Sequence, residues 1–294
     1  MRNTSALKQL LARRAAVIIP GTGNALFARV IEDLGFECVY VSGAGVANMH
    51  LGVPDVGLTT MTELADAVTA ISDAVRLPLI VDADTGFGNP VNMVRTVRVL
   101  ERMGAAGIQI EDQVFPKKCG HFAGKQVIPL PEMLQKVAAA VDARRDPDLQ
   151  IIVRTDARAI EGLDRAIERA QAFAEAGADA TFVEAPITAE ELARISREIR
   201  VPQIANMVFG GKTPEVGCEK LKQMGFSAVL YANAALQAAL RGAHEVLQAL
   251  KSEGSLASVA DRLATFEERQ NAVAKDAWDA LETRYTGPHL AGKS

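Results

Sequence analysis

Short apolar runs alternate with helical apolar patterns along the chain, and the segment from Pro78 to His121 shows this alternation most clearly. Two runs in it, PLIVDADTGFG and GIQIEDQ, begin apolar and end in acidic residues, as buried strands that reach a polar edge do. Between them, Asn89–Met103 has the apolar spacing of a helix, with Pro90 at its first position. A strand, a helix and a strand of this length predict a βαβ unit, which builds a parallel sheet.

The same alternation recurs often enough to predict a barrel. We predict eight strands, near residues 17, 39, 80, 109, 152, 182, 203 and 229. Helices are expected at residues 24–34, 62–75, 89–103, 131–144, 163–176, 189–199, 219–224 and 234–251, with Thr62 as the cap of the second. Eight such units predict an α/β fold of the (β/α)8 TIM-barrel type, and an open doubly wound sheet is the alternative. The early GTGNAL stretch is a weak dinucleotide signal, because it lacks the third glycine of that motif.

A helical pattern continues beyond the eighth unit. We expect residues 1–294 to form one barrel domain in which residues 254–285 are a C-terminal helical arm, with apolar anchors that include Leu263, Phe266 and Trp278. A barrel with eight helices does not require this arm. It either folds back on its own barrel or packs on another subunit, and periodicity alone leaves both alternatives open.

Composition narrows the class of protein. The chain has 294 residues, of which 49% are hydrophobic, and its formal net charge is −4. It carries no basic footprint, so nucleic acid is not an expected partner. No apolar run approaches the roughly 20 residues of a membrane helix, so no membrane is expected either. The N-terminus has no signal-peptide pattern, and the three cysteines show no paired spacing, which together favour a cytoplasmic location.

Carboxylates gather at the predicted strand ends. Asp82 and Asp84 share one side of their strand because strand side chains repeat every two residues, and Glu111 ends the next strand. Such residues can simply cap turns. Clustered carboxylates repel one another unless a cation lies among them, however, and oxygen ligands suit Mg²⁺. The pattern therefore favours a metal site at the carboxyl ends of the strands, the edge that carries the chemistry in barrels.

Other polar residues follow the remaining strands. Arg154 beside several carboxylates predicts an anionic, carboxylate-bearing substrate, although an ion pair with Glu184 or Asp156 is the structural alternative. The Ser42-Gly43-Ala44 segment offers successive backbone N–H donors, although a serine before glycine is more often just a turn.

Cys119 lies in the stretch KKCGH, between lysines and a histidine. These neighbours favour the thiolate form and so a functional role, whereas a lone cysteine elsewhere is commonly a small buried apolar residue. No glycine elbow or Ser/His/Asp order supports a hydrolase triad.

At this point the motifs are specific enough to name a resemblance. VDADTGFG, IEDQ, KKCGH, RTDA, VEAP and ANM followed by GGKTP resemble those of the isocitrate lyase and phosphoenolpyruvate mutase superfamily, in order and over nearly the whole chain. KKCGH is similar to the motif of the carbon–carbon lyases, such as 2-methylisocitrate and 2,3-dimethylmalate lyases and the petal death protein, and phosphonate mutases lack that cysteine. NMVFGGKTP is nearer to the 2,3-dimethylmalate lyase and petal death protein branch. Pro186 stands where oxaloacetate acetylhydrolases carry a serine, which counts against that activity.

The resemblance implies roles for individual residues. Asp82 would be the direct Mg²⁺ ligand, and Asp55, Asp84 and Glu111 would hold the waters of the metal, for which Mn²⁺ is an alternative. The carboxylate of the departing 2-keto acid would be bound by Ser42, Gly43, Ala44 and Arg154. The second carboxylate would be bound by Gly120, His121 and Asn206. Tyr40 would lie near the reacting centre and Glu184 would orient its neighbours, so the expected catalytic residues are Cys119, Tyr40, His121, Arg154 and Glu184.

The implied reaction is the retro-Claisen cleavage of a 2-hydroxy dicarboxylate, of the 2,3-dimethylmalate or other 2-alkylmalate type or the 2-methylisocitrate type. Its products would be pyruvate or another 2-keto acid and a carboxylate. The alternatives are an oxaloacetate decarboxylase or carboxyvinyl-carboxyphosphonate phosphorylmutase-type activity on the same scaffold, and a non-catalytic carboxylate-binding barrel. The resemblance also implies a homotetramer, a dimer of dimers, with a helix exchanged between partner barrels.

Overall fold

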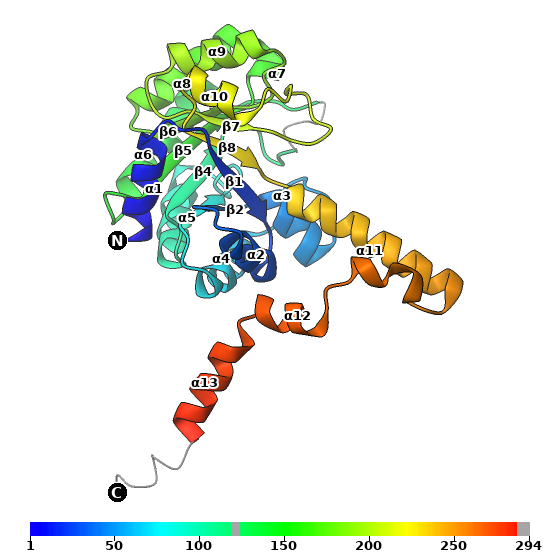
Figure 1. Cartoon of the computed structure of the whole chain (residues 1–294). Coiled ribbons are helices and arrows are strands. Elements are labelled where there is room, and N and C mark those ends of the chain that lie inside the picture. Colours follow the sequence, from blue (N-terminus) through cyan, green and yellow to red (C-terminus); the bar gives the residue numbers. More distant parts are fainter. Residues whose placement is uncertain (119–123, 287–294) are drawn as a thin grey trace, which may run out of the picture. The chain divides into compact units, whose positions relative to one another are not determined.

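The computed structural model describes residues 1–118 and 124–286 (Figure 1). Within these residues the eight predicted strands are all present: β1 (Val17–Thr22), β2 (Val39–Val41), β3 (Leu79–Asp82), β4 (Gly107–Glu111), β5 (Gln150–Thr155), β6 (Ala180–Val183), β7 (Ile204–Asn206) and β8 (Ala228–Tyr231). They form one parallel sheet in the order β6-β5-β4-β3-β2-β1-β8-β7. The two outer strands meet through a parallel bridge between Thr181 and Gln203, which also hydrogen-bond through their side chains. The sheet is therefore a nearly closed (β/α)8 barrel, which confirms the predicted fold over the open sheet.

The helices between the strands also follow the prediction. They are α2 (Ala25–Asp33), α4 (Met61–Ala74), α5 (Pro90–Arg102), α6 (Leu130–Ala143), α8 (Leu163–Glu175), α9 (Ala189–Glu198) and α10 (Cys218–Met224), and a further helix, α1 (Asn3–Ala12), precedes β1. Asn24 and Asn89 cap α2 and α5. The predicted cap of α4, Thr62, is wrong. The helix begins at Met61, and Thr60 is its N-cap, which forms a capping box with Glu63. No helix among the described residues is long and apolar enough to cross a membrane.

Short helices occupy two of the loops that follow strands. After β2 the chain forms α3 (Gly43–Val46) and the π-helix η1 (Ala47–Leu51), and after β5 it forms α7 (Arg158–Glu161). Ser42 caps α3 by accepting a hydrogen bond from Gly45 N at 3.1 Å. The loop that leads toward Asp55 is therefore partly helical.

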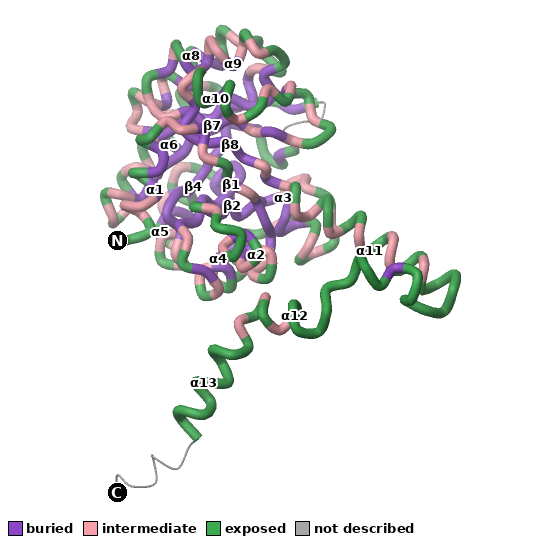
Figure 2. Tube along the Cα trace, in the orientation of Figure 1, coloured by how far each residue is buried: buried purple, intermediate pink, exposed green. Residues whose placement is uncertain are grey.

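The buried apolar residues lie on both sides of the strands, and Figure 2 shows how buried residues concentrate along the strands of the barrel. Inward-pointing residues such as Ile80, Ile152 and Phe182 cluster with Leu7, Leu10 and Leu11 of α1. Outward-pointing strand residues pack against the surrounding helices. Since α1 packs on the inner cluster, it closes the amino-terminal end of the barrel and leaves the carboxyl end for the polar residues.

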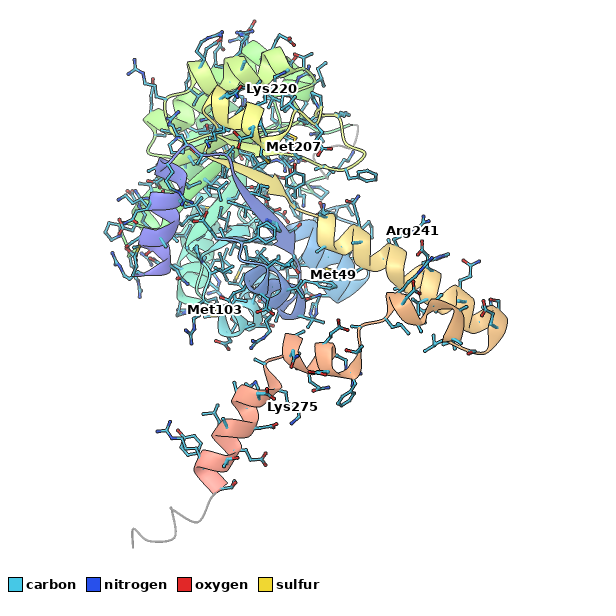
Figure 3. The ribbon with its side chains drawn as sticks, in the orientation of Figure 1. Met49, Met103, Met207, Lys220, Arg241 and Lys275 are labelled. Atoms are coloured by element: carbon cyan, nitrogen blue, oxygen red, sulfur yellow. The ribbon has the colours of Figure 1, made fainter. Side chains whose placement is uncertain are left out.

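Internal contacts divide the chain into two units, residues 1–236 and 237–294. Most of α11 (Ala234–Glu253) belongs to the second unit, together with the 3₁₀ segment η2 (Ala257–Arg262), α12 (Phe266–Ala272) and α13 (Lys275–Thr286). Arg241 and Lys275, labelled in Figure 3, make exposed ion pairs one turn away with Glu245 and Asp279. Such pairs contribute only about 0.2–1 kcal/mol each. The predicted extent of the arm, residues 254–285, stays a prediction.

Candidate active site

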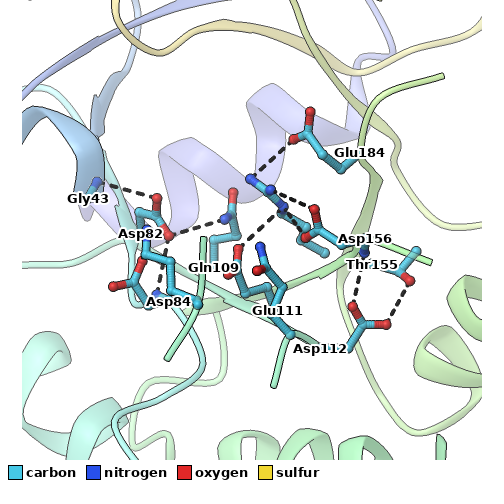
Figure 4. Close-up of polar contacts among 12 residues, drawn as sticks. Gly43, Asp82, Asp84, Gln109, Glu111, Asp112, Thr155, Asp156 and Glu184 are labelled. Atoms are coloured by element: carbon cyan, nitrogen blue, oxygen red, sulfur yellow. Dashed lines mark hydrogen bonds and ion pairs between the residues drawn. The ribbon is translucent and has the colours of Figure 1, made fainter. Parts of the chain in front are cut away.

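Three of the predicted carboxylates meet at the carboxyl ends of β3 and β4 (Figure 4). Three nitrogen atoms donate to Asp82: Asp84 N (3.2 Å), Gly43 N (3.3 Å) and Gln109 Nε2 (3.3 Å). Asp84 lies just after β3 and has a φ of 48°. This left-handed backbone conformation is energetically unfavourable for residues other than glycine and is often found at functional sites. A Cβ atom on Gly43 would lie 3.1 Å from oxygens of both Asp82 and Asp84, so this close approach has little room for a side chain.

Lys117 brings Asp55 into the cluster by forming ion pairs with Asp55 and with Asp84, where Nζ lies 2.8 Å from Oδ1. Lys117 is thus the cation that faces Asp84 Oδ1, an oxygen with no further hydrogen bond among the described residues. Glu111 Oε1 is likewise buried without a hydrogen-bond partner among the described residues. Buried acceptors are normally satisfied, so a water molecule or a hydrated ion is expected beside Glu111 Oε1.

These residues fit a hydrated divalent ion. Within residues 1–118 and 124–286, no three His, Cys, Asp or Glu side chains are placed to ligate one metal directly. Asp82 and Glu111 do line a common cavity, and Glu111 Oε1, which lacks a hydrogen-bond partner among the described residues, could accept a hydrogen bond from a metal-bound water. One direct carboxylate and several waters is the coordination that Mg²⁺ commonly adopts in proteins.

Burial makes the carboxylate cluster hard to ionise without a cation. It raises the pKa of Asp84 to about 7, because Lys117 only partly opposes the loss of solvent and Asp82 adds repulsion. Burial also raises the pKa of Glu111 well above its usual range, against the opposing effect of Arg154. A divalent ion among these groups would favour their charged forms and lower both pKa values.

Arg154, at the end of β5, lies among carboxylates. Its guanidinium bonds Asp156 through Nε (2.9 Å) and a terminal nitrogen (3.0 Å), and reaches Glu184 at 3.1 Å and Glu111 at 3.3 Å. Burial alone would lower the pKa of Arg154. The surrounding carboxylates outweigh burial and raise that pKa well above its usual value, so the guanidinium stays charged. The structural ion pairs that the sequence allowed are therefore present, and substrate binding by Arg154 stays a prediction.

Tyr40 and Asn206 lie in the same cavity, each held by one neighbour. The Tyr40 hydroxyl donates to Gln109 Oε1 at 2.9 Å. Burial, with repulsion from Asp82, raises the pKa of Tyr40 well above its usual value. Asn206 Nδ2 donates to Glu184 at 3.2 Å, and its buried Oδ1 has no hydrogen-bond partner among the described residues. Glu184 therefore contacts both Arg154 and Asn206, as an orienting residue would.

The predicted residues Cys119, Gly120 and His121 lie outside the described residues, so their placement is not part of this geometry. The residues on either side of them are anchored. Gln113 holds the backbone of Lys118 with two hydrogen bonds, of 2.8 and 2.9 Å. Lys125 forms a buried ion pair with Asp156, the residue that also holds Arg154.

Three features of the site escaped sequence reasoning: Gln109, the contact of Lys117 with the carboxylates, and Asn233. Asn233 lies just beyond the end of β8, so the rule that found the other strand-end residues could have found it. Gln109 lies inside β4 and Lys117 reaches the cluster from a loop. Neither position follows a rule that can be applied before the fold is known.

The comparisons with known proteins agree with this geometry. A model of the phosphoenolpyruvate phosphomutase family matches residues 7–251. The chain is 45% identical to 2,3-dimethylmalate lyase from Eubacterium barkeri, over 91% of this chain and 93% of that protein. It is also 45% identical to 2-methylisocitrate lyase from Aeropyrum pernix, over 88% and 83%. A crystal structure of phosphonopyruvate hydrolase in complex with oxalate and Mg²⁺ superposes with a TM-score of 0.88 at 29% identity, covering 97% of this chain and all (100%) of the other. The barrel, its strand-end carboxylates and this match over most of the sequence place the chain in the phosphoenolpyruvate phosphomutase family.

Proposed function

We propose that the protein is a Mg²⁺-dependent carbon–carbon lyase that cleaves a 2-hydroxy dicarboxylate into pyruvate, or another 2-keto acid, and a carboxylate. The observation that carries the proposal is the buried cluster of Asp82, Asp84 and Glu111 directly beside Arg154, in which Glu111 Oε1 has no hydrogen-bond partner among the described residues. It offers a cation site and a fixed positive charge within one cavity. The lyases named among its relatives and the cysteine of the KKCGH stretch support cleavage of a carbon–carbon bond.

The metal would be held by Asp82 directly and by Asp55, Asp84 and Glu111 through water. When bound, it would supply Lewis-acid chemistry, which lowers the pKa of the 2-hydroxyl and stabilises negative charge on oxygen. The Ser42-Gly43-Ala44 segment, together with Arg154, would form the site for the carboxylate of the half that leaves as the 2-keto acid. Asn206, with Gly120 and His121, would bind the other carboxylate.

The reaction needs one proton removed and one proton delivered. Loss of the 2-hydroxyl proton lets the bond between the second and third carbons break, and its electrons move into the remaining carboxylate as an enediolate. Cys119 would then protonate that carbon. Burial, with repulsion from Asp82, raises the pKa of Tyr40, and a phenol that holds its proton more tightly is a weaker candidate for the role of base. This favours an ordered water over Tyr40 for the first proton transfer.

Product analysis tests the proposal. Purified protein with Mg²⁺ should release pyruvate from a 2-alkylmalate such as 2,3-dimethylmalate or from 2-methylisocitrate, measured by coupling to lactate dehydrogenase. Oxaloacetate and phosphonopyruvate are the comparison substrates, and phosphorus NMR follows the latter. If oxaloacetate were the single substrate turned over, with release of carbon dioxide, the result would instead support a decarboxylase. If phosphonates were the single class turned over, it would support a mutase. Carboxylate binding without turnover of any of them would leave a non-catalytic barrel.

We also infer that the chain forms a homotetramer, a dimer of dimers, in the cytoplasm. The exposed apolar side chains of residues 237–286 support association, and the sparse, unpaired cysteines of the sequence support a reducing compartment. Exchange of a helix between partner barrels would cover those side chains.

A further inference from the structure

The hydroxyl of Ser42 is fully committed inside the protein. Its oxygen accepts a hydrogen bond from Gly45 N at 3.1 Å as the cap of α3. Its single hydrogen is donated to Asn233 Oδ1, also at 3.1 Å. A serine hydroxyl has one hydrogen to give. Ser42 therefore cannot donate to a bound carboxylate unless it first breaks its bond to Asn233.

The neighbouring backbone donor is committed as well. Gly43 N donates to Asp82 Oδ2 at 3.3 Å. Of the Ser42-Gly43-Ala44 segment that was expected to bind a carboxylate, two of the three groups are thus already used. That leaves Ala44 and Arg154 to contact a carboxylate bound here, and a further donor would stabilise it, because a buried anion needs hydrogen bonds to replace those it made with water.

Asn233 supplies such a donor. It follows β8 and lines the same cavity as Ser42 and Arg154. Its oxygen is occupied by the Ser42 hydroxyl, which fixes the orientation of the amide and leaves the Nδ2 hydrogens for other acceptors. None of the described residues accepts a hydrogen bond from that nitrogen. The amide is half-buried at the wall of the cavity, so substituting it does not open the core.

Resting on the lyase function proposed above, we propose that Asn233 is a substrate-binding residue whose Nδ2 donates to the carboxylate held at the Ser42–Ala44 segment. Ser42 then acts through Asn233, by holding its amide with the nitrogen toward the cavity. Leu230 and Ala232, which precede Asn233 in the cavity wall, are apolar and offer no competing acceptor from their side chains. The wall contributed by β8 would thus bind one carboxylate oxygen beside an alkyl-tolerant surface.

The test compares Asn233→Leu and Asn233→Asp with wild type. The leucine variant keeps a similar volume and loses the donor, so KM for the alkylmalate that is cleaved should rise about 10- to 100-fold, the range for a hydrogen bond to a charged group. Turnover should change much less, because the contact is made with bound substrate and transition state alike. The aspartate variant should be worse than the leucine variant, since it places an acceptor and a negative charge opposite the carboxylate. Thermal melts with Mg²⁺ show whether either change acts through stability instead.

A double-mutant cycle with Ser42→Ala tests whether Asn233 binds the substrate directly or only positions Ser42. If Asn233 binds substrate itself, Asn233→Leu should still raise KM when Ser42 is alanine. If Asn233 only positions Ser42, the double variant should resemble Ser42→Ala alone, and the proposal is then wrong. Wild-type KM in Asn233→Leu would overturn it as well.

Binding of oxalate in the presence of Mg²⁺, measured by calorimetry, keeps this inference distinct from the proposed reaction. Oxalate presents a carboxylate beside a second chelating oxygen, as a 2-keto acid does. Wild type that binds oxalate and cleaves no alkylmalate would refute the reaction, and a 10-fold weaker oxalate affinity in Asn233→Leu would still support the role of Asn233. Equal affinity in the two proteins would refute that role even if the reaction is correct. Failure of wild type to bind oxalate would count against both.

Discussion

The barrel and the C-terminal unit differ in how far their side chains are buried. In the barrel, even charged residues such as Glu111 and Asp156 are buried, and each lies within reach of Arg154. Among residues 237–286, Val259 alone is buried. Large apolar side chains there are mostly exposed: Phe266 by 73%, Trp278 by 65% and Tyr285 by 60%. Figure 2 shows the same contrast in the colour of the two traces, each taken by itself.

This contrast separates two tasks. The barrel buries most of its apolar side chains in its own core and gathers charges at one end, which is what a reaction involving anions requires. The C-terminal unit leaves apolar surface without cover in its own fold, and such surface usually marks association. Substitutions in the barrel site should therefore change turnover with little effect on assembly. Substitutions in the C-terminal unit should change assembly first.

The largest effect should come from removing the metal site. Treatment with EDTA should abolish turnover, and added Mg²⁺ should restore it. Asp82→Ala should remain inactive at any Mg²⁺ concentration, while the assembly measured by light scattering stays that of wild type. Asp66→Ala, an exposed aspartate on α4, is the matched control and should behave as wild type. Full activity in chelator, or an unaffected Asp82→Ala variant, would remove the metal from the proposal.

A smaller but still large loss is expected from Cys119→Ser. A serine hydroxyl is a far weaker acid than a thiol, and general acid catalysis contributes about 10²–10⁴-fold, so turnover should fall within that range. Apparent substrate affinity should change less, because the proton is delivered late in the reaction. Steady-state kinetics on the cleaved substrate, with thermal melts alongside, provide the measurement. Normal turnover by the variant would take Cys119 out of the mechanism, whereas a loss confined to stability would make it a structural cysteine.

Association of subunits through the C-terminal unit can be disrupted separately. Phe266→Glu combined with Trp278→Glu places charges on the exposed apolar surface and should lower the solution mass from a tetramer to a dimer or monomer. Multi-angle light scattering at micromolar concentration measures this. Glu267→Gln, on the same helix as Phe266, is the control and should leave the mass unchanged. A wild-type protein that is already monomeric would contradict the inferred role of the C-terminal unit.

The smallest effect concerns acid stability. Arg154 and Lys125 outweigh burial and lower the pKa of Asp156 to about 2. Because an unfolded aspartate titrates near 3.9, this group stabilises the fold above about pH 4 and loses that contribution as the pH falls toward 2. Urea unfolding should therefore show a shallower loss of stability between about pH 4 and 2 in Asp156→Asn than in wild type. Equal slopes in the two proteins would show that Asp156 does not carry this pH dependence.

Much of the barrel could be predicted because its signals are local. Each strand is a short apolar run, and the caps Asn24 and Asn89 stand directly before their helices. The Thr62 error was also local, since Thr60 has Glu63 three residues later and satisfies the capping-box pattern better. The π-helix at Ala47–Leu51 could not be foreseen, because its composition does not distinguish it from a loop.

The candidate site was predictable only in part, for a physical reason. Asp82, Asp84 and Glu111 follow their strands directly, so the parallel arrangement alone brings them together. The contacts of Lys117 with Asp55, and of Asn233 with Ser42, join residues 62 and 191 positions apart in the sequence. Such contacts depend on how loops fold over the end of the barrel, and no spacing in the sequence encodes that.

The helix that closes the amino-terminal end of the barrel also dictates an order of events during synthesis. Residues in and just before α1 form hydrogen bonds with two aspartates that follow α6: Arg2, Ser5 and Lys8 bind Asp148, and Thr4 binds Asp146. These partners lie 140 to 146 positions later in the sequence. The first helix to leave the ribosome therefore waits until about half of the chain has been translated before those partners exist. Until then Leu7, Leu10 and Leu11 have no barrel interior to enter, and the nascent chain must keep them from binding elsewhere.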